Sequence, residues 1–527
     1  MKNTYIYLLL LGFLSLSSCS FDAELYTQQT DANFYKNKDD AFAALVGCYD
    51  GLQVVGGRGG LSFTVISELM SDDCFGGTGT NDGYGFQAVD EFDISRSPAD
   101  VDLLNGNWID YYKALYRCNV FLGKMDQIDW GGDDALRITY ESEARFIRAY
   151  LYFEMVRLWG NIPLLTEPSR ENIPQANPDD VYKVIAQDLM FATDNLPAEA
   201  YNKVDSGRIT KWAAKSMLAR VYLYYTGYYG KSDLVGLVSK SDALGHLEDV
   251  ITNSGHGLVD DFSTLWPAAS AIAGTYAGEG NKENVFSIKF TYTSDFNGNT
   301  DGNHWMVMFG MRGFSSYPYG QGWGITVNSK LWNSYSPNDT RQVASVIGIE
   351  EEGLGLNKDG QREYTGYYTK KYTPMSDKNN NPVTDGLGAG SFQISQFQDY
   401  IVMRYSDVLL MAAELGSANA QNYFDQVRQR AYKGNFTSIP VNQANIMKER
   451  HLEFALEGIR YWDLLRQGVS VAAAEIAETT TLSDGSTPIT KTITAAKIQA
   501  TNGLSQIPNT QITLSGGVLQ QNAGWDF

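Results

Sequence analysis

The chain has 527 residues, of which 43% are hydrophobic, so its length and composition allow a large buried core. With 61 acidic and 41 basic residues it carries a net charge of −20, and an acidic protein is repelled by phosphate backbones, which excludes nucleic acid as an expected partner. Only 19% of the residues are charged and 13% are aromatic, which predicts aromatic-rich loops over a packed scaffold.

The first 20 residues have the pattern of a bacterial lipoprotein signal peptide. Lys2 precedes an apolar run at 5–14, which is about half the length of a membrane-spanning helix and therefore predicts a cleaved export signal. The sequence Leu16-Ser17-Ser18-Cys19 has the form of a lipobox. We expect residues 1–18 to be removed and Cys19 to carry the acyl chains that hold the protein on a membrane. The alternative is a secreted protein with an accidental cysteine.

Helical periodicity dominates residues 19–260. Between Leu136 and Leu158 apolar residues recur every three or four positions, and further apolar residues make the other faces apolar too, so this helix should be buried on more than one side. Asp133 and Asp134 are acidic residues of the kind that favours the first turn of a helix, and Gly160 predicts where the helix ends. Other helices are expected at about 38–54, 106–128, 178–195, 208–228 and 241–253. Such helix pairs with short connections predict a mainly α, tetratricopeptide-like scaffold, although no strict repeat period is present.

Residues 261–527 form the second expected region, packed on the first. Its first part, 261–395, is rich in Gly, Asn, Ser and aromatic residues and predicts long loops with short strands, for example at 285–290. Helices are expected again at about 407–433 and 442–467.

The end of the chain and the cysteines are less informative. The segment from about 477 is rich in Thr and Ser and is expected to be irregular, with Trp525 and Phe527 packed at its end. Besides Cys19 there are three cysteines, Cys48, Cys74 and Cys118. Because this number is odd, at least one should be a free and buried thiol.

Two C-terminal segments carry a family resemblance. One is MRYSDVLLMAAE at 403–414 and the other is KERHLEFALEGIRYWDLLR at 448–466. Both resemble signature segments of the SusD/RagB-like nutrient-binding lipoproteins of the Bacteroidetes. Further segments that resemble this family lie at 143–150, 159–163, 207–225 and 519–525, so the resemblance covers nearly the whole mature chain.

The resemblance implies a function. Members of this family are helical, non-enzymatic lipoproteins that capture a nutrient, usually a glycan and in some members a peptide, and act as a lid on a SusC-like TonB-dependent barrel of the outer membrane. Asp22 and Glu24 closely follow Cys19, and acidic residues there resemble the signal that sends such lipoproteins to the cell exterior. The expected partners are therefore a ligand, a transporter and, through the lipid anchor, the outer membrane.

The charged residues of the second signature segment favour a structural role. Carboxylates that lie beside arginines on a helix stay ionised, which is the opposite of what a general acid needs at neutral pH. Gly458 interrupts this pattern and predicts a close backbone approach. Three pairs have the i, i+3 spacing that brings side chains together on a helix: Arg450 with Glu453, Glu457 with Arg460, and Asp463 with Arg466.

The sequence predicts neither a catalytic centre nor a bound cofactor. Its four histidines have no metal-ligand spacing, and there is no nucleophile elbow or phosphate loop. Asp72, Asp73, Asn81 and Asp82 offer oxygen ligands for Ca²⁺, but their spacing fits no EF-hand loop. A glycosidase needs two carboxylates on either side of the scissile bond, and the sequence alone does not exclude such a pair.

Aromatic residues in loops are the better sign of function. The C–H faces of sugars pack on aromatic rings, while their hydroxyls bond to amide and charged side chains. The family's ligand residues lie outside its signature segments, so these candidates are chosen by region, and each could instead belong to the core. The candidate ligand-binding residues are Asn81, Tyr84, Phe86, Tyr276, Tyr292, Asn303, Trp305, Tyr319 and Trp323.

Several functions stay open at this point. The first is capture of a glycan, and the second is capture of a peptide by a member of the same family. A surface glycoside hydrolase would need a carboxylate pair in a cleft, whereas an adaptor for a protein partner would need an exposed apolar groove.

Overall fold

The computed structural model describes residues 34–525 with the exception of 96–97 and 101. The predicted signal peptide, the lipidation site Cys19, the acidic pair Asp22 and Glu24, and Phe527 lie outside the described residues.

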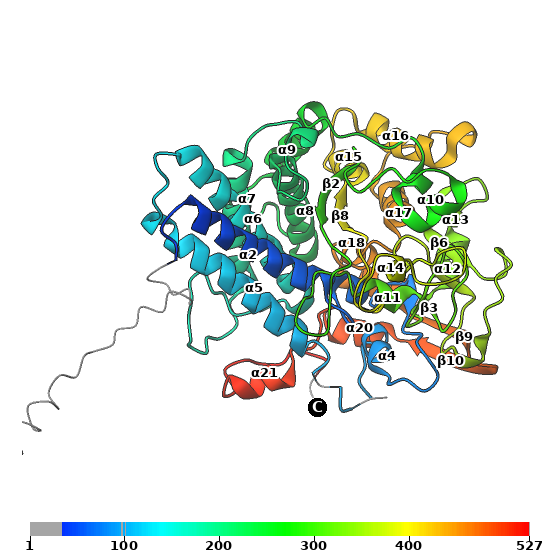
Figure 1. The fold of residues 1–527 in the computed structure, drawn as a ribbon. Helices are drawn as coiled ribbons and strands as arrows, with labels where there is room; N and C mark the ends of the chain where they lie inside the picture. Colours follow the sequence, from blue (N-terminus) through cyan, green and yellow to red (C-terminus); the bar gives the residue numbers. More distant parts are fainter. Residues whose placement is uncertain (1–33, 96–97, 101, 526–527) are drawn as a thin grey trace, which may run out of the picture.

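Long helices form one half of the molecule, from α2 in blue to α9 in green (Figure 1). From α5 onward each packs against the next along the chain, and α2 packs on both α5 and α6. These helices confirm the predicted mainly α scaffold. Their bounds are α2 (Lys38–Gly57), α5 (Asn105–Lys124), α6 (Asp134–Trp159), α7 (Pro178–Asn195), α8 (Lys211–Tyr229) and α9 (Lys240–Asn253).

Local sequence signals explain where these helices begin and end. The side chain of Asp133 accepts a hydrogen bond from the amide of Leu136 and caps α6, as Asn177 and Ser239 cap α7 and α9. Pro178 occupies the first turn of α7, where its missing N–H costs nothing. Gly160 ends α6 with a φ of 67°, a conformation that glycine adopts without strain.

Helix α6 is the centre of the scaffold. It packs against α2, α5 and α7, and almost every residue of its C-terminal half is buried, which confirms that more than one face is covered. The ring of Phe146 lies edge-on to Phe286 of β2 (Asn284–Ile288), and Trp159 lies edge-on to Trp108 of α5. Aromatic packing therefore joins the helical scaffold to the second half of the chain.

The second half consists of short elements joined by long loops (Figure 1). Each sheet has two strands: β1 (Cys74–Phe75) with β5 (Thr326–Val327), β2 with β8 (Tyr400–Arg404), β3 (Met311–Arg312) with β4 (Gln321–Gly322), β6 (Val346–Gly348) with β7 (Tyr367–Thr369), and β9 (Glu478–Asp484) with β10 (Thr487–Ile493). Only the β3–β4 pair is parallel among these sheets of the described residues. The predicted loop-rich character of 261–395 and the strand near 285 are confirmed.

The remaining helices are mostly short. Two lie in the first half: α3 (Phe63–Leu69) and α4 (Gly85–Asp90). The others are α10 (Pro267–Ala273), α11 (Met306–Phe309), α12 (Ser329–Ser334), α13 (Arg341–Ser345), α14 (Val383–Gly386), α15 (Tyr405–Glu414), α16 (Ala420–Tyr432), α17 (Gln443–Phe454), α18 (Arg460–Leu465), α19 (Val469–Ile476), α20 (Ala495–Ala500) and α21 (Asn509–Leu514). No helix in the described part of the chain has both the length and the apolar character needed to cross a membrane.

The structure refines two sequence predictions and corrects a third. The segments 407–433 and 442–467 are helical as predicted, but each is divided into two helices, and the second break contains Leu456 and Gly458 with φ of 64° and 74°. The tail is not irregular, since β9 and β10 pair as a hairpin around Gly485. The two-residue loop Gly485-Ser486 between Thr-rich, β-branched runs is a hairpin signal that outweighs the polar composition. Trp525 is buried as predicted, and its indole N–H donates to the carbonyl of Leu504 at 2.9 Å.

A buried charge network holds the second half together. We define the Arg404 network by its cations Arg341, Lys371, Arg404 and Arg430 and the acids Glu283, Asp339, Glu449, Glu453 and Glu457, all of them buried. Burial alone would raise the pKa of Glu453, but the charges of Arg430, Arg404 and Arg341 outweigh it and hold this pKa well below its usual range. The network joins β8, α13, α16 and α17, so the charged signature residues are structural.

The ion pairs of the second signature segment, 448–466, differ from the i, i+3 pairs that the sequence predicts. Asp463 and Arg466 do form an i, i+3 pair at 2.8 Å. Glu453 and Glu457 instead bind Arg404 at 2.7 and 2.8 Å. The predicted pair of Glu457 and Arg460 does not form because the chain turns between α17 and α18, and Arg460 binds Asp72. Arg450 and Glu453 both lie in α17, but Arg450 binds Asp407 and Asp463 instead. The three described cysteines, Cys48, Cys74 and Cys118, are free and buried. The sequence predicts a free and buried thiol for at least one of them.

Candidate functional site

Three of the candidate ligand residues lie in the interior. Trp305 and Asn303 have no exposed surface, and Tyr319 is 1% exposed. The ring of Trp305 packs edge-on against Phe309, Tyr372 and Tyr400. Asn303 donates to the carbonyl of Gln398 at 2.9 Å, and the Tyr319 hydroxyl donates to Glu352 at 2.6 Å. Their location is a correction to the regional prediction, because buried side chains cannot meet a ligand at the surface.

Two other candidates lie nearer the surface but make contacts of their own. Tyr292 is 38% exposed and lies edge-on to Phe397. Tyr276 is half-buried, and burial together with the charges of Glu279 and Asp399 raises the pKa of its hydroxyl. In the described residues no hydrogen bond or ring contact joins Tyr276 or Tyr292 to the other candidate residues.

The structure gathers Asn81, Tyr84 and Trp323 around two arginines that sequence reasoning missed. Arg362 is buried under the loop 79–84 and donates to the carbonyls of Gly83, Asp82 and Thr80 at 2.8, 2.7 and 3.0 Å. Its guanidinium also lies 4.1 Å from the ring centre of Tyr84. Arg362 therefore fixes both the path of the loop and one face of this ring.

Arg312 makes the second connection. Its guanidinium donates to Asp82 at 2.9 Å and lies 4.5 Å from the ring centre of Trp323. The parallel pairing of Arg312 with Gly322 places Trp323 beside it, and the carbonyl of Arg312 accepts a hydrogen bond from Gln361 at 2.8 Å. We call Asn81, Asp82, Tyr84, Arg312, Trp323 and Arg362 the Arg312 cluster.

The Arg312 cluster has the features of a surface that binds a polar ring. Tyr84 is 37% exposed and Trp323 is partly exposed, and a guanidinium covers one face of each ring, which fixes its orientation. Asn81 is exposed at the tip of the same loop. Phe86 follows in α4 and packs partly against the core. Aromatic faces next to amide and guanidinium donors suit a ligand with both C–H faces and hydroxyls.

The carboxylates that offer oxygen ligands for Ca²⁺ contact basic side chains of the protein. Arg460 holds Asp72 at 2.7 and 2.8 Å, and although burial raises the pKa of Asp72, Arg460 lowers it to about 2. Asp73 contacts the Nε2 of His451 at 2.6 Å, and Asp82 binds Arg312. Asp72, Asp73 and His451 each place one ligand atom within 4.8 Å of the others.

Comparison with known proteins places the chain in a family. The family model of the SusD family matches residues 220–525, which is more than half of the chain. The chain belongs to the SusD family. A second model, described as starch-binding and associating with the outer membrane, matches residues 78–223 and so includes Tyr84.

The curated relatives are distant in sequence but match over most of their length. SusD-like protein P25 of Formosa agariphila is 25% identical over 474 residues, which cover 83% of this chain and 84% of that protein. A SusD-like protein of Bacteroides ovatus is 26% identical over 412 residues, which cover 73% and 69%.

Solved structures share the whole fold. Surface glycan-binding protein A from Bacteroides fluxus superposes with a TM-score of 0.74 at 24% identity and covers 92% of this chain and 99% of its own. A laminarin-binding SusD-like protein reaches 0.71 at 28% identity, with coverage of 93% and 99%. The surface glycan-binding protein A from Bacteroides thetaiotaomicron, in complex with laminarihexaose, reaches 0.71 at 22% identity, with coverage of 92% and 100%.

Proposed function

We propose that this SusD-family chain is a lipoprotein of the outer cell surface that binds an oligosaccharide at the Arg312 cluster and delivers it to a SusC-like TonB-dependent transporter. The observation that supports the binding site is the pair Tyr84 and Trp323, two partly exposed rings that are each backed by an arginine. Capture does not require chemistry, so we infer a binding protein rather than an enzyme.

Physical chemistry favours these two rings over the other candidates. A ring that is held in place loses little conformational entropy when a ligand stacks on it. Arg362 holds both the loop 79–84 and the ring of Tyr84, and Arg312 holds the ring of Trp323. The exposed amide of Asn81 lies three residues before Tyr84, and the partly exposed guanidinium of Arg312 lies 4.5 Å from the ring centre of Trp323, so both can offer N–H donors to sugar hydroxyls. Asp82 uses its oxygens on Arg312 and on the amide of Gly79, and so it serves the loop rather than catalysis.

The relatives suggest which glycan to test first. One similar structure is described as laminarin-binding, and another was solved with laminarihexaose. We therefore expect laminari-oligosaccharides to be the best first ligands in a screen that also includes other glycans and peptides. The description of the matching family model supports association with the outer membrane, and the predicted anchor is Cys19.

The decisive experiment is calorimetric titration of the mature chain carrying Cys19→Ala, which lacks acyl chains. Trp323→Ala and Tyr84→Ala should each weaken binding by about 1–3 kcal/mol, which is roughly 5- to 150-fold in Kd, while thermal melts hardly change. Tyr116→Ala is the matched control, because Tyr116 is a 55% exposed tyrosine on α5, outside the Arg312 cluster. It should bind like the wild type.

Other results would contradict specific parts of the proposal. Equal affinity in all three variants would remove the Arg312 cluster as the binding site. Binding of peptides but not of glycans would favour the peptide-binding alternative, and shortened oligosaccharides after long incubation would favour a hydrolase.

The anchor and the transporter need separate tests. For the anchor, Cys19→Ala should release the protein from the membrane fraction, and its retention would exclude lipidation as the attachment. For the transporter, the barrel should co-purify with the wild-type protein from solubilised membranes.

A further inference from the structure

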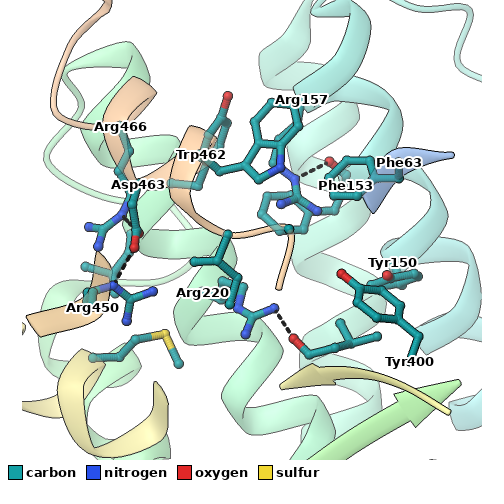
Figure 2. A pocket seen from close by; sticks show the side chains of 16 residues that line it. Phe63, Tyr150, Phe153, Arg157, Arg220, Tyr400, Arg450, Trp462, Asp463 and Arg466 are labelled. Atoms are coloured by element: carbon teal, nitrogen blue, oxygen red, sulfur yellow. Dashed lines mark hydrogen bonds and ion pairs between the residues drawn. The ribbon is translucent and has the colours of Figure 1, made fainter. Parts of the chain in front are cut away.

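A cavity of about 40 Å³ lies where the signature segments meet the helical scaffold (Figure 2). Its walls come from α3, α6, α8, β8, α15, α17 and α18, and four arginines line it: Arg157, Arg220, Arg450 and Arg466. Because one water needs about 10–15 Å³ of such space, the cavity has room for about three waters or for one small ion.

Three of these arginines have carboxylate partners. Arg220 and Arg450 both bind Asp407, and Arg450 also binds Asp463 at 2.7 Å. Arg466 binds Asp463 at 2.8 Å and Glu414 at 2.5 and 2.8 Å. Figure 2 shows Arg450 and Arg466 converging on Asp463. The charges of these three arginines are thus balanced by three buried or nearly buried acids.

Arg157 differs from the other three. It is 6% exposed, and no carboxylate in the described residues pairs with it. Its Nε donates to the carbonyl of Phe153 at 3.2 Å, and its guanidinium lies 4.0, 4.4 and 5.1 Å from the ring centres of Phe153, Phe63 and Trp462. Aromatic rings cover the faces of this planar cation, so its Nη edge is what remains for the cavity that it lines.

The nearest acid along α6 does not supply the missing partner. Glu154 lies one turn earlier and accepts hydrogen bonds from the hydroxyls of Tyr111 and Tyr150 at 2.6 and 2.5 Å. Burial raises the pKa of Glu154, and burial lowers the pKa of Arg157 more than the charge of Glu154 raises it. A buried cation without a directly bonded partner is costly, and an anion in the cavity would relieve that cost.

We propose that this cavity is a binding site for a single small anion of halide size, held in the plane of the Arg157 guanidinium. Arg220 and Arg450 also line the cavity, but Asp407 and Asp463 balance their charges, so the ion is held by Arg157. The cavity is too small for a sugar or a phosphorylated metabolite, so the ion has a structural role: it fixes α6 against α18 and the signature segments. This site is separate from the Arg312 cluster and does not depend on the proposed glycan binding.

Two measurements on the mature chain carrying Cys19→Ala test the proposal. Crystals soaked in sodium bromide should show an anomalous peak in the cavity within hydrogen-bond distance of the Arg157 Nη atoms. In melts at constant ionic strength, replacing gluconate by chloride or bromide should raise Tm by several degrees, because a ligand that binds only the folded state stabilises it; above Kd the rise should follow the logarithm of the halide concentration. Gluconate is too large to enter.

Variants separate a specific site from a general salt effect. Arg157→Met should abolish the rise in Tm with halide, whereas Arg137→Met should keep it, since Arg137 is a 37% exposed arginine on the same helix. If Arg157→Met does not fold, bromide diffraction on the wild type decides alone. A cavity without an anomalous peak, together with equal Tm in chloride and gluconate, would overturn the proposal and leave water as the occupant.

Discussion

Truncation of Trp305 to alanine separates core packing from ligand binding. Trp305 has no exposed surface, and its ring contacts Phe309, Tyr372 and Tyr400 edge-on at centroid distances of 5.9, 4.9 and 5.5 Å. Loss of a fully buried Trp side chain costs about 3–5 kcal/mol of folding free energy. The indole N–H has no hydrogen-bond partner among the described residues, so its removal offsets about 1 kcal/mol of that cost. We expect a net destabilisation of about 2–4 kcal/mol.

The assay compares Trp305→Ala with Trp323→Ala in denaturant unfolding and in titration with the glycan found by screening. Trp305→Ala should lower the free energy of unfolding and leave the affinity per folded molecule unchanged. Trp323→Ala should do the reverse, because its ring is partly exposed on Arg312. Trp305→Phe keeps an aromatic ring in place and should cost less than the alanine variant.

A clear result would refute this reasoning. If Trp305→Ala unfolds within about 0.5 kcal/mol of the wild type and binds its ligand more weakly, then the ring is not a core element in solution and belongs to the binding surface. A loss of both stability and affinity in Trp323→Ala would show that its ring supports the fold of the Arg312 cluster as well as the ligand.

The helical half could be predicted because its signals are local. Helix α7 has the predicted bounds since Asn177 and Pro178 mark its start, and Pro197 follows its end. The burial of α6 on several faces also followed from its sequence, because apolar residues surround the helix axis. Caps and periodicity act within a few residues, so a single sequence contains them.

The charge network could not be predicted in the same way. Arg404 binds Glu283, which is 121 residues away along the chain, and no period relates the two. The expected pair of Glu457 and Arg460 does not form because Gly458 turns the chain between them, with a φ of 74°. Helical spacing therefore identified charged residues with a structural role but not their partners.

The binding surface was predictable only as a region. Trp305 and Trp323 have similar neighbours in sequence, rich in Gly, Asn and Tyr, yet one is in the core and the other lies on Arg312. Which of them is buried depends on Tyr372, Tyr400 and Arg312, and local composition does not show which distant residues will cover a loop.

Three further predictions concern buried groups. Arg404→Met should cost about 3–5 kcal/mol in denaturant unfolding, because it leaves buried carboxylates short of a cation, whereas Arg137→Met at an exposed pair should cost at most about 1 kcal/mol. Gly458→Ala should destabilise by about 1–3 kcal/mol, since φ is 74° and a Cβ would lie 3.1 Å from a tyrosine hydroxyl, while Gly47→Ala, inside α2 with open space, should stabilise by about 0.5–1 kcal/mol. The last concerns His256, which is 9% exposed and whose pKa burial lowers to about 4. In the unfolded chain this pKa returns to about 6.5, so between pH 6.5 and pH 4 the unfolded state binds more protons, and the stability present above pH 6.5 is lost as the pH falls. Relative to His256→Asn, which keeps an N–H donor but does not titrate, the wild type should lose about 2 kcal/mol of unfolding free energy between pH 7 and pH 5 in chemical denaturation. Parallel curves for the two proteins would mean that burial does not keep His256 neutral, and hence that water reaches its ring.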